Sequence, residues 1–552
     1  MTVSATLEMT EMSLALASPA IDAGREARAD RLKPLLLLLR GPFITFGPGG
    51  LPRIALLVRV PTCPGFRKRF KARGRVPDWG VFSDAGTADN NERTNAMATV
   101  HEDLPPPEIG LSRAGETGGA TSTGRINHDG PLLMDDNFDG REETFCRPCN
   151  GNTGGSGPWE FTIPASNHFL MLPSLCLEMT VKVTKGDGTD LQNDDFVAPI
   201  NLLGQTMWES VAVTLNDTPI NPRSSANTNY KSYIETVLSS RNSAALTRLK
   251  SQVFYPDSGG RFNRLTYAND AMGAAADNEG FRVRRGLFTE SRANTLMVPV
   301  CADFLHSDKH LAPHNRLTLR FTRAPDNFVL MAANVAEGYK LEISDLKLHF
   351  IRLKTKTPLT FRKERYLSTR TELRRIAIPQ NETSFHATIQ QAGRLPKSII
   401  FGLVHSAALE GAYNRNPFFF HHHALTSVNL RVGGVQVPLN PYEPNFLANP
   451  PKVYREYNAL VNNLGGLYNN RGLLIPPEEF VTGYTFFAYD LSPDLCNGRH
   501  LHPSGKGDVD LGLSFRDALA EPVTLVVHLS YDDMIIQTTD EHNAKKIEIV
   551  EL

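Results

Sequence analysis

Ser210–Ile220 reads Ser-Val-Ala-Val-Thr-Leu-Asn-Asp-Thr-Pro-Ile, and Ser427–Val437 reads Ser-Val-Asn-Leu-Arg-Val-Gly-Gly-Val-Gln-Val. Both stretches alternate apolar and polar residues, pass through two residues typical of tight turns, and then enter a second strand-like run. Alternation with a period of two indicates a strand with one buried face, and the central pair indicates a hairpin turn. The two stretches therefore predict the same hairpin at two places in the chain.

The sequence before each hairpin is duplicated as well. A short strand-like run comes first, at Trp159–Ile163 and again at Thr383–Ile389. A Leu-Pro pair then opens a second apolar run, at Leu172-Pro173 and again at Leu395-Pro396. The repeated order of strand, Leu-Pro, strand and hairpin predicts two tandem β modules of about two hundred residues each.

Each module has room for about eight strands, and eight antiparallel strands in two facing sheets form a jelly roll. We predict an all-β chain of two tandem eight-stranded jelly-roll sandwiches (a double jelly roll) with long loops. A short helix is predicted at Asn229–Leu238, where apolar residues recur at helical spacing, and an irregular polar loop at 241–290. The predicted domains are an N-terminal extension at 1–155, a first jelly roll at 156–355, a second jelly roll at 371–540 and a C-terminal tail at 541–552.

The extension differs in composition from the rest of the chain. Residues 1–155 lack the periodicity that a buried core needs, so we predict that they are mostly disordered. They include a basic cluster, Phe66–Arg75, which is either a nuclear-import or nucleic-acid patch or a solvated disordered run. Met97 precedes an acidic, proline-rich stretch, so Met1 and Met97 are both candidate translation starts. A further basic and polar segment, Lys354–Arg370, is predicted to connect the two modules.

The overall composition excludes some classes of protein. The chain has 552 residues, of which 41% are hydrophobic and 21% charged, and its net charge is −1. Proteins that coat nucleic acid usually carry an excess of Lys and Arg over Asp and Glu, so specific nucleic-acid binding is not predicted. The most apolar run, Leu35–Leu39, is far shorter than the roughly 18 residues of a membrane span. Six cysteines are too few for a disulfide scaffold and indicate reduced thiols, with Cys176 and Cys301 in apolar runs.

His421, His422 and His423 form the most obvious candidate site. In a strand, His421 and His423 would share one face and could bind a metal ion together. A metal-binding jelly roll also needs a glutamate a few residues later, but Ala424–Asn429 contains no acid. We therefore interpret the three histidines as side chains of a packed strand or an interface.

Three other motifs are incomplete. Cys146-x-x-Cys149 is half of a zinc site without a second pair, and Tyr531-Asp532-Asp533 resembles a polymerase metal turn but ends a strand. Pro503–Gly507 contains the Gly-Lys pair of a phosphate-binding loop without its other residues, and the Gly-x-Ser-x-Gly elbow is absent. We predict no catalytic, cofactor-binding or metal-binding residues and no enzymatic activity.

Several stretches resemble the double jelly-roll major capsid proteins of Polinton-like (Maverick) elements and adintoviruses, including their endogenous copies in animal genomes. The resemblance covers about residues 157–540. It rests mainly on the order in which the motifs follow one another along the chain. The stretches are Phe196–Leu203, Val211–Asn216, Tyr230–Ser239, Arg394–Pro396, Ile399–Val404, Gly411–Phe418, Pro441–Phe446 and Gly483–Leu495. The long N-terminal extension and His421–His423 depart from the family pattern.

The resemblance implies a structural role. It implies homotrimers whose six jelly rolls form a pseudo-hexagonal tile, and tiles that build an icosahedral shell around double-stranded DNA. The implied partners are neighbouring capsomers and a penton or minor capsid protein, and the implied location is the virion, assembled in the nucleus or cytoplasm of a host cell. The alternative is a double β-sandwich that binds carbohydrate or is a metal-dependent enzyme, which would need an aromatic platform, clustered acids or metal ligands in a cleft.

Overall fold

The computed structural model describes residues 138–150, 157–223, 225–266, 277–357, 361–466, 473–495, 501–540 and 544–552. These residues belong to one compact unit. Most of the predicted extension lies outside them, including the basic cluster Phe66–Arg75 and Met97, and so do Cys63 and Cys496. Within these ranges, no helix combines the length and the apolar character needed to cross a membrane.

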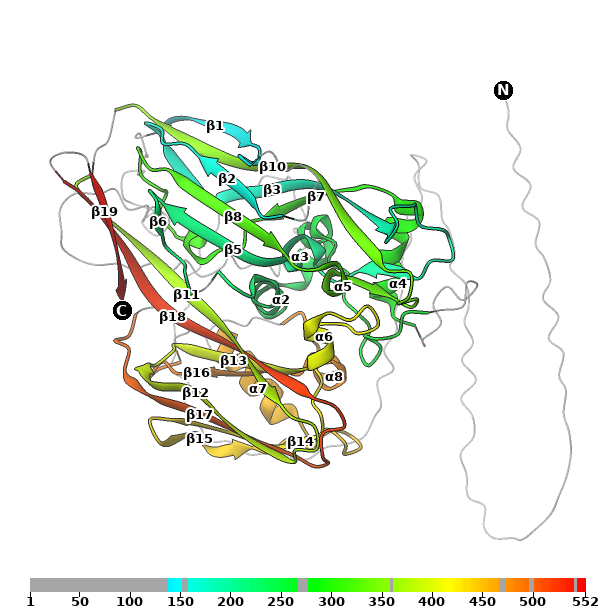
Figure 1. Cartoon of the computed structure of the whole chain (residues 1–552). Helices are drawn as coiled ribbons and strands as arrows, with labels where there is room; N and C mark the ends of the chain where they lie inside the picture. The colour runs from blue at the N-terminus through cyan, green and yellow to red at the C-terminus, as the bar shows by residue number, and fades with distance from the viewer. Residues whose placement is uncertain are drawn as a thin grey trace, which may run out of the picture. The chain divides into compact units, whose positions relative to one another are not determined.

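The first half of the described chain forms two antiparallel four-stranded sheets (Figure 1). Their strands are β1 (Phe138–Cys146), β2 (Trp159–Ile163), β3 (Phe169–Lys185), β5 (Trp208–Leu215), β6 (Thr218–Pro219), β7 (Asn294–Pro299), β8 (Leu317–Arg323) and β10 (Tyr339–Thr355). One sheet has the order β1-β10-β3-β7 and the other has the order β2-β8-β5-β6. A small additional sheet pairs β4 (Val197–Pro199) with β9 (Leu330–Ala332).

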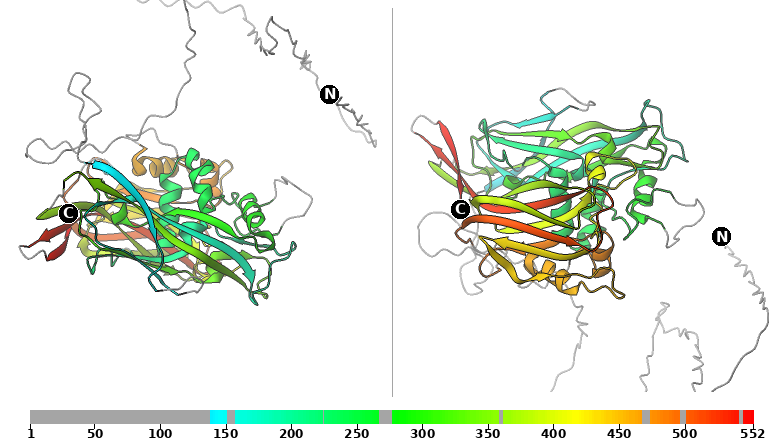
Figure 2. Two further views of the ribbon diagram at one scale, coloured as in Figure 1. Left: turned by 90° about the horizontal axis from the view of Figure 1, so that it is seen from above. Right: turned by 60° about the horizontal axis from the view of Figure 1, so that its bottom comes forward.

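The second half repeats this arrangement. Its strands are β11 (Lys363–Ile378), β12 (Ser384–Arg394), β13 (Ser398–His405), β14 (Leu425–Val432), β15 (Val435–Tyr442), β16 (Phe487–Asp490), β17 (Lys506–Phe515) and β18 (Val523–Thr539). They form the sheets β11-β18-β13-β16 and β12-β17-β14-β15, and β19 (Lys545–Glu551) pairs with the end of β18. Figure 2 shows from further directions that the β18–β19 hairpin, in red, extends beyond its sandwich.

The two halves share one strand topology. If the eight sandwich strands of each half are counted in chain order, one sheet joins the first, eighth, third and sixth strands, and the other joins the second, seventh, fourth and fifth. This is the strand order of a jelly roll. The predicted fold class, two tandem eight-stranded jelly rolls, is therefore confirmed.

The duplicated hairpins form as predicted. The turn between β5 and β6 has positive φ at Asn216 (45°) and Asp217 (69°), and the turn between β14 and β15 has positive φ at Gly433 (57°) and Gly434 (81°). Two successive positive φ values are typical of the type I′ turn, whose twist matches that of the flanking strands. The hairpins differ in length, because β6 has two residues and β15 has eight.

Helices lie mainly in the connections between strands. The first half contains α1 (Leu203–Thr206), α2 (Thr228–Ser239), α3 (Asn242–Leu246), η1 (Arg248–Gln252), α4 (Glu279–Phe288), η2 (Thr289–Ser291), η3 (Asp303–His306) and α5 (Asp326–Val329). The second half contains α6 (Ser406–Glu410), α7 (Tyr454–Val461), η4 (Asn462–Gly466) and α8 (Pro477–Thr482). The helix predicted at Asn229–Leu238 is confirmed by α2.

Two predicted segments differ in the structure. The expected loop at 241–290 contains α3, η1 and α4, and α4 begins at a cap in which the Asn278 side chain accepts a hydrogen bond from the Phe281 N–H. Strands enter the expected connector Lys354–Arg370 from both ends, because β10 continues to Thr355 and β11 begins at Lys363. Tyr366 is buried among its charged neighbours, so the apolar signal of β11 is sparse.

The strands also extend past the predicted domain limits. β1 lies upstream of residue 156 and pairs with β10, and β11 begins upstream of residue 371. β19 lies in the segment predicted as a C-terminal tail. Leu172-Pro173 falls inside β3, where its pairing with β10 shifts register, rather than at the start of a strand. Proline cannot donate to a ladder hydrogen bond, which suits an irregular position of this kind.

Candidate functional site at the junction of the two jelly rolls

Helix α2 of the first jelly roll lies against the outer face of the β11-β18-β13-β16 sheet of the second (Figure 1). Glu235 of α2 contacts His528 of β18, with 3.2 Å between Oε1 and Nε2. The Arg375 guanidinium of β11 lies 5.4 Å from the ring centroid of Tyr230. β18 is buried at nine successive positions, Val523–Tyr531. The second jelly roll therefore has a sheet that is covered on both faces.

An aromatic cluster fills the same junction. Tyr233 of α2 stacks on Phe418 of the second jelly roll, with ring centroids 4.1 Å apart and an interplanar angle of 10°. The Tyr230 hydroxyl donates to the Pro417 carbonyl at 2.9 Å. All of these rings are buried. Stacked aromatic pairs contribute roughly 0.5–1.5 kcal/mol beyond their buried area.

A buried carboxylate joins the two halves beside this cluster. Asp257 and Arg284 of the first half form an ion pair with an N–O distance of 2.7 Å, and both side chains are 0% exposed. The amide of Asn278 donates to Asp257 Oδ1 at 2.8 Å, and the amide of Asn416, from the second half, donates to Oδ2 at 2.9 Å. Because a buried charge is costly without partners, this set of contacts favours one arrangement of the two jelly rolls.

A second ionic cluster surrounds Glu235. Lys231 of α2 pairs with Asp303 of η3, and Asp303 Oδ2 also accepts the backbone N–H of Thr371 of β11 at 2.9 Å. Burial opposes ionisation of Glu235, but the charge of Lys231 and the hydrogen bond from His528 outweigh it and hold the Glu235 pKa below its usual range. This cluster is a second polar connection between the halves.

The end of the second jelly roll also contacts the first. Lys545 of β19 donates through Nζ to the His314 carbonyl at 3.0 Å and to Asn315 Oδ1 at 2.9 Å. The Tyr366 hydroxyl of β11 accepts the Ala312 N–H at 3.1 Å. The junction is therefore held by an aromatic cluster, two charged clusters and this terminal contact.

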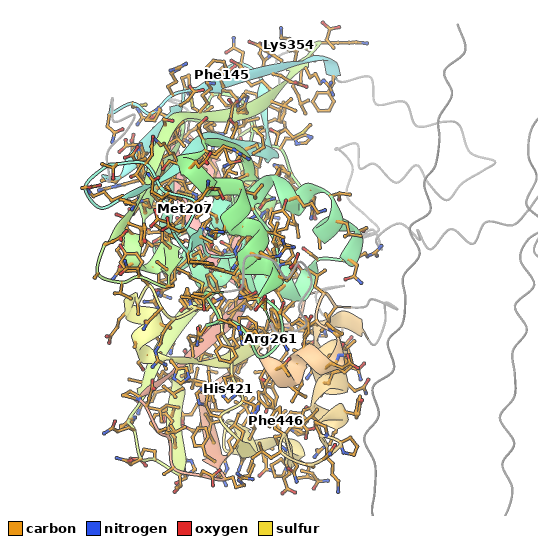
Figure 3. The ribbon with its side chains drawn as sticks, turned by 90° about the vertical axis from the view of Figure 1, so that its right-hand side faces the viewer. Phe145, Met207, Arg261, Lys354, His421 and Phe446 are labelled. Atoms are coloured by element: carbon orange, nitrogen blue, oxygen red, sulfur yellow. The ribbon has the colours of Figure 1, made fainter. Side chains whose placement is uncertain are left out.

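The three histidines lie elsewhere in the second jelly roll, and their predicted strand is wrong. His423 and Ala424 have positive φ values of 44° and 52°, so the chain turns here. The His421 Nδ1 accepts the His423 N–H at 3.1 Å, and the His422 Nδ1 accepts the Ala424 N–H at 2.9 Å. These local hydrogen bonds favour a turn over a strand. Figure 3 shows His421 and Phe446 on the second jelly roll, toward the opposite end of the view from Phe145 and Lys354.

The histidines pack as neutral side chains. The His422 ring stacks on Phe446 with centroids 4.4 Å apart. Burial lowers the pKa of His421 to about 4 and that of His422 to about 3, and burial together with the neighbouring histidines lowers that of His423 to about 2. Among the residues that the structure describes, no group of three or more His, Cys, Asp or Glu side chains is arranged to hold a metal ion.

The incomplete motifs have structural contacts. Burial and Cys149 raise the Cys146 pKa to about 11, which disfavours the thiolate that metal binding and nucleophilic attack require. Asp533 accepts from Arg370 of β11 and Arg394 of β12, each at 2.6 Å, and therefore links the two sheets of its sandwich. Asp532 pairs with Lys397 at 3.0 Å. In Pro503–Gly507, the Ser504 hydroxyl donates to the Leu552 carbonyl at 2.6 Å, and Lys506 opens β17.

The resemblance motifs Tyr230–Ser239 and Gly411–Phe418 contain several junction residues, but sequence reasoning did not assign them a contact with each other. Asp257 and Asn416 are 159 residues apart in the chain, and no local pattern connects them. The one available signal was compositional, because Asp257 follows the aromatic run Phe254-Tyr255 and Asn416 precedes Phe418–Phe420. A polar residue that adjoins buried aromatic residues in the sequence is a candidate for burial, and a buried polar side chain needs a hydrogen-bond partner.

Comparisons with known proteins find likeness mainly in the fold. No family model matches the chain. An uncharacterised protein of Caenorhabditis elegans is 24% identical over 377 residues, which cover 65% of this chain and 86% of that protein.

The chain is also similar to solved structures, of which two illustrate the likeness. A chain in the cryo-EM structure of the Sputnik virophage has a TM-score of 0.55 at 11% identity, covering 79% of this chain and 94% of that chain. The mavirus major capsid protein has a TM-score of 0.46 at 10% identity, covering 82% of this chain and 97% of that chain. At these identities the likeness shows the fold alone. The likeness to the Sputnik chain, together with the strand order, establishes that the chain has the double jelly-roll fold.

Proposed function

We propose that the protein is a structural, non-enzymatic major capsid protein whose homotrimers form pseudo-hexameric tiles of an icosahedral shell around double-stranded DNA. The observation that carries the proposal is the junction: two jelly rolls of identical topology are held in one arrangement by the Tyr233–Phe418 stack and the Asp257 cluster. A trimer of such subunits places six similar sandwiches around one axis. A tile of this kind needs a rigid β core.

The fold likeness supports this role. The matched Sputnik chain comes from a virophage particle and is covered over 94% of its length. The sequence resemblance supports the narrower assignment to the capsid proteins of Polinton-like elements and adintoviruses. The net charge of −1 suits a subunit whose neighbours are copies of itself, because strong like charge would oppose assembly.

The proposed capsid role assigns a place in the subunit to each jelly roll, and it names the binding partners and the location of the protein. The predicted jelly rolls at 156–355 and 371–540, extended to include β1, β11 and β19, are the two halves of each of the three subunits in a tile. The partners are neighbouring capsomers and a penton or minor capsid protein, and the location is the virion after assembly in a host cell.

Two measurements on purified full-length protein test the proposal. Light scattering coupled to size-exclusion chromatography should give the mass of three chains, and electron microscopy should show tiles with six-lobed outlines or closed shells. A protein that stays monomeric at its highest soluble concentration and forms no particles would contradict the proposal. Saturable binding to a glycan array, or a metal-dependent activity, would favour the alternative β-sandwich functions.

A further inference from the structure

Equivalent sheets of the two jelly rolls differ in whether their outer face, which points away from the interior of the sandwich, is covered by other parts of the chain. In the second, the sheet β11-β18-β13-β16 is covered by α2 and by the chain around Phe418–Phe420. A Cβ at Gly402 of β13 would lie only 2.6 Å from Phe420 Cδ1, which shows how closely this face is packed. In the first, β3 alternates strictly between buried and partly exposed residues from Leu175 to Val183. Its sheet is therefore covered on one face only.

The strand register shows which residues make up the open face of the first jelly roll. Lys347, Glu178 and Met297 lie opposite one another across β10, β3 and β7, and Phe145 lies opposite His349 across β1 and β10. Directly opposed residues share a face of the sheet. Phe145 is 48% exposed and Met297 is 39% exposed. We call this surface, defined by Phe145, Lys347, His349, Glu178 and Met297, the open face.

The charges of the open face are already paired within the sheet. Glu178 accepts from Lys347 Nζ at 3.0 Å, and its other oxygen lies 2.7 Å from His349 Nε2. Covering this face would therefore leave no unpaired charge, which is the usual obstacle to burying such groups. The remaining side chains, Phe145 and Met297, would gain from burial.

The second jelly roll has a counterpart to α2. Helix α2 lies in the connection from β6 to β7, and α7 and α8 lie in the equivalent connection, from β15 to β16. The stretch Leu439–Tyr454, from within β15 to the start of α7, carries three exposed large apolar side chains: Leu439 is 83% exposed, Tyr454 65% and Leu447 49%. The Arg455 guanidinium ties α7 to β15 by donating to the Asn440 and Pro441 carbonyls at 2.8 and 2.7 Å. We call Leu439–Tyr454 the apolar segment.

We propose that the apolar segment of one copy packs on the open face of the next copy, and so repeats between chains the contact that α2 makes within the chain. The inference rests on the proposed function, since it names the surfaces that join the trimer. Within the chain, the helical connection of the first jelly roll covers the outer sheet of the second. The equivalent sheet of the first jelly roll and the side chains Leu447 and Tyr454 of the equivalent connection are exposed and, among the described residues, remain without such a contact between the two halves. A contact between two different surfaces closes into a ring when the rotation allows it, here at three copies.

Two double variants and a control test the location of the contact. The segment variant is Leu439→Asp with Tyr454→Asp, and the face variant is Phe145→Asp with Met297→Glu. All four side chains are exposed, so each variant should fold, which near-ultraviolet circular dichroism and the melting temperature check. The control is Val335→Asp, at a side chain that is 50% exposed and belongs to neither surface.

Mixing the two variants gives the decisive readout. The parent protein and the control should have the mass of three chains, and each variant alone the mass of one. An equimolar mixture at the highest soluble concentration should contain two-chain species, because one intact segment can meet one intact face but the ring cannot close. Variants that stay trimeric, or a mixture that stays monomeric, would overturn the inference and leave the capsid proposal intact. A monomeric parent protein would overturn both.

Discussion

Asn416, in the second jelly roll, donates its side-chain amide to the buried carboxylate of Asp257, in the first, at 2.9 Å. Arg284 and Asn278 supply the other partners of that carboxylate, and the Arg284 and Asp257 side chains are entirely buried. The hydrogen bond makes the two halves depend on each other, because neither half alone satisfies Asp257. We expect the described part of the chain to unfold as one cooperative unit rather than as two domains.

Removing the arginine should be more damaging than removing the amide. Arg284→Met leaves a buried carboxylate without its charge partner, which typically costs 3–5 kcal/mol of stability, whereas Asn416→Ala removes one hydrogen bond of the set and should cost about 1–3 kcal/mol. Urea denaturation followed by tryptophan fluorescence measures both values. Asp257→Asn combined with Arg284→Met should recover part of the loss, and equal losses for the single and double variants would contradict a charge-based account.

The Tyr233–Phe418 stack should contribute strongly to stability. Phe418→Ala removes a fully buried ring at the junction and leaves a cavity beside Tyr233, so we expect a loss of about 3–5 kcal/mol. Val335→Ala is the control, because that side chain is 50% exposed, lies in neither proposed contact surface, and its truncation should change stability by about 0.5 kcal/mol or less. Thermal unfolding of the two variants side by side tests the difference, and similar melting temperatures would show that the stack does not hold the junction together.

Gly402 tests how closely the covered face is packed. A methyl group there would meet the Phe420 ring at 2.6 Å and the Thr485 carbonyl at 3.2 Å. Gly402→Ala should therefore cost about 1–3 kcal/mol through overpacking. Gly140→Ala in β1 is the control, since nothing lies within 4 Å of the added atom, and it should be neutral or slightly stabilising. A neutral result at Gly402 would mean that the Phe420 ring moves aside without loss.

The fold could be predicted from the sequence because its signals are local and repeated. The run Trp159–Ile163 coincides with β2, and the paired stretches around Ser210 and Ser427 form hairpins with the same type of turn. A strand that is buried on one face needs apolar and polar residues in alternation, so each such strand can be recognised from its own sequence. The strand β13, buried on both faces, is an uninterrupted apolar run and was recognised through the Leu-Pro pair before it.

The remaining features depend on contacts that no local pattern records. His421–His423 could not be placed by alternation, because three identical residues have no period, and their turn depends on two hydrogen bonds from ring nitrogens. The strand β11 was hidden by its charged residues, and one of them, Arg370, pairs with the distant acid Asp533. The junction depends on Asp257, Asn416, Glu235 and His528, which come together only when both jelly rolls have formed.

The buried histidines should make stability depend on pH between about 7 and 4. The folded pKa values of His421 and His422 are lowered to about 4 and 3, chiefly by burial, whereas an unfolded histidine has a pKa near 6.5. Below pH 6.5 the unfolded chain therefore binds protons that the folded chain does not bind. This contribution to stability is fully present above pH 6.5 and falls as the pH is lowered, by about 1.4 kcal/mol per pH unit for each such histidine.

The double substitution His421→Asn and His422→Asn isolates this effect. The asparagine Oδ1 can accept the hydrogen bonds that the two Nδ1 atoms accept from His423 and Ala424, so the turn should persist. Urea midpoints measured from pH 7.5 to pH 5 should show a clearly shallower decline for this variant than for the parent protein. His386→Asn, at an exposed histidine, is the control and should leave the slope unchanged. An identical pH dependence in the double variant and the parent protein would show that these side chains are not held neutral in the folded state.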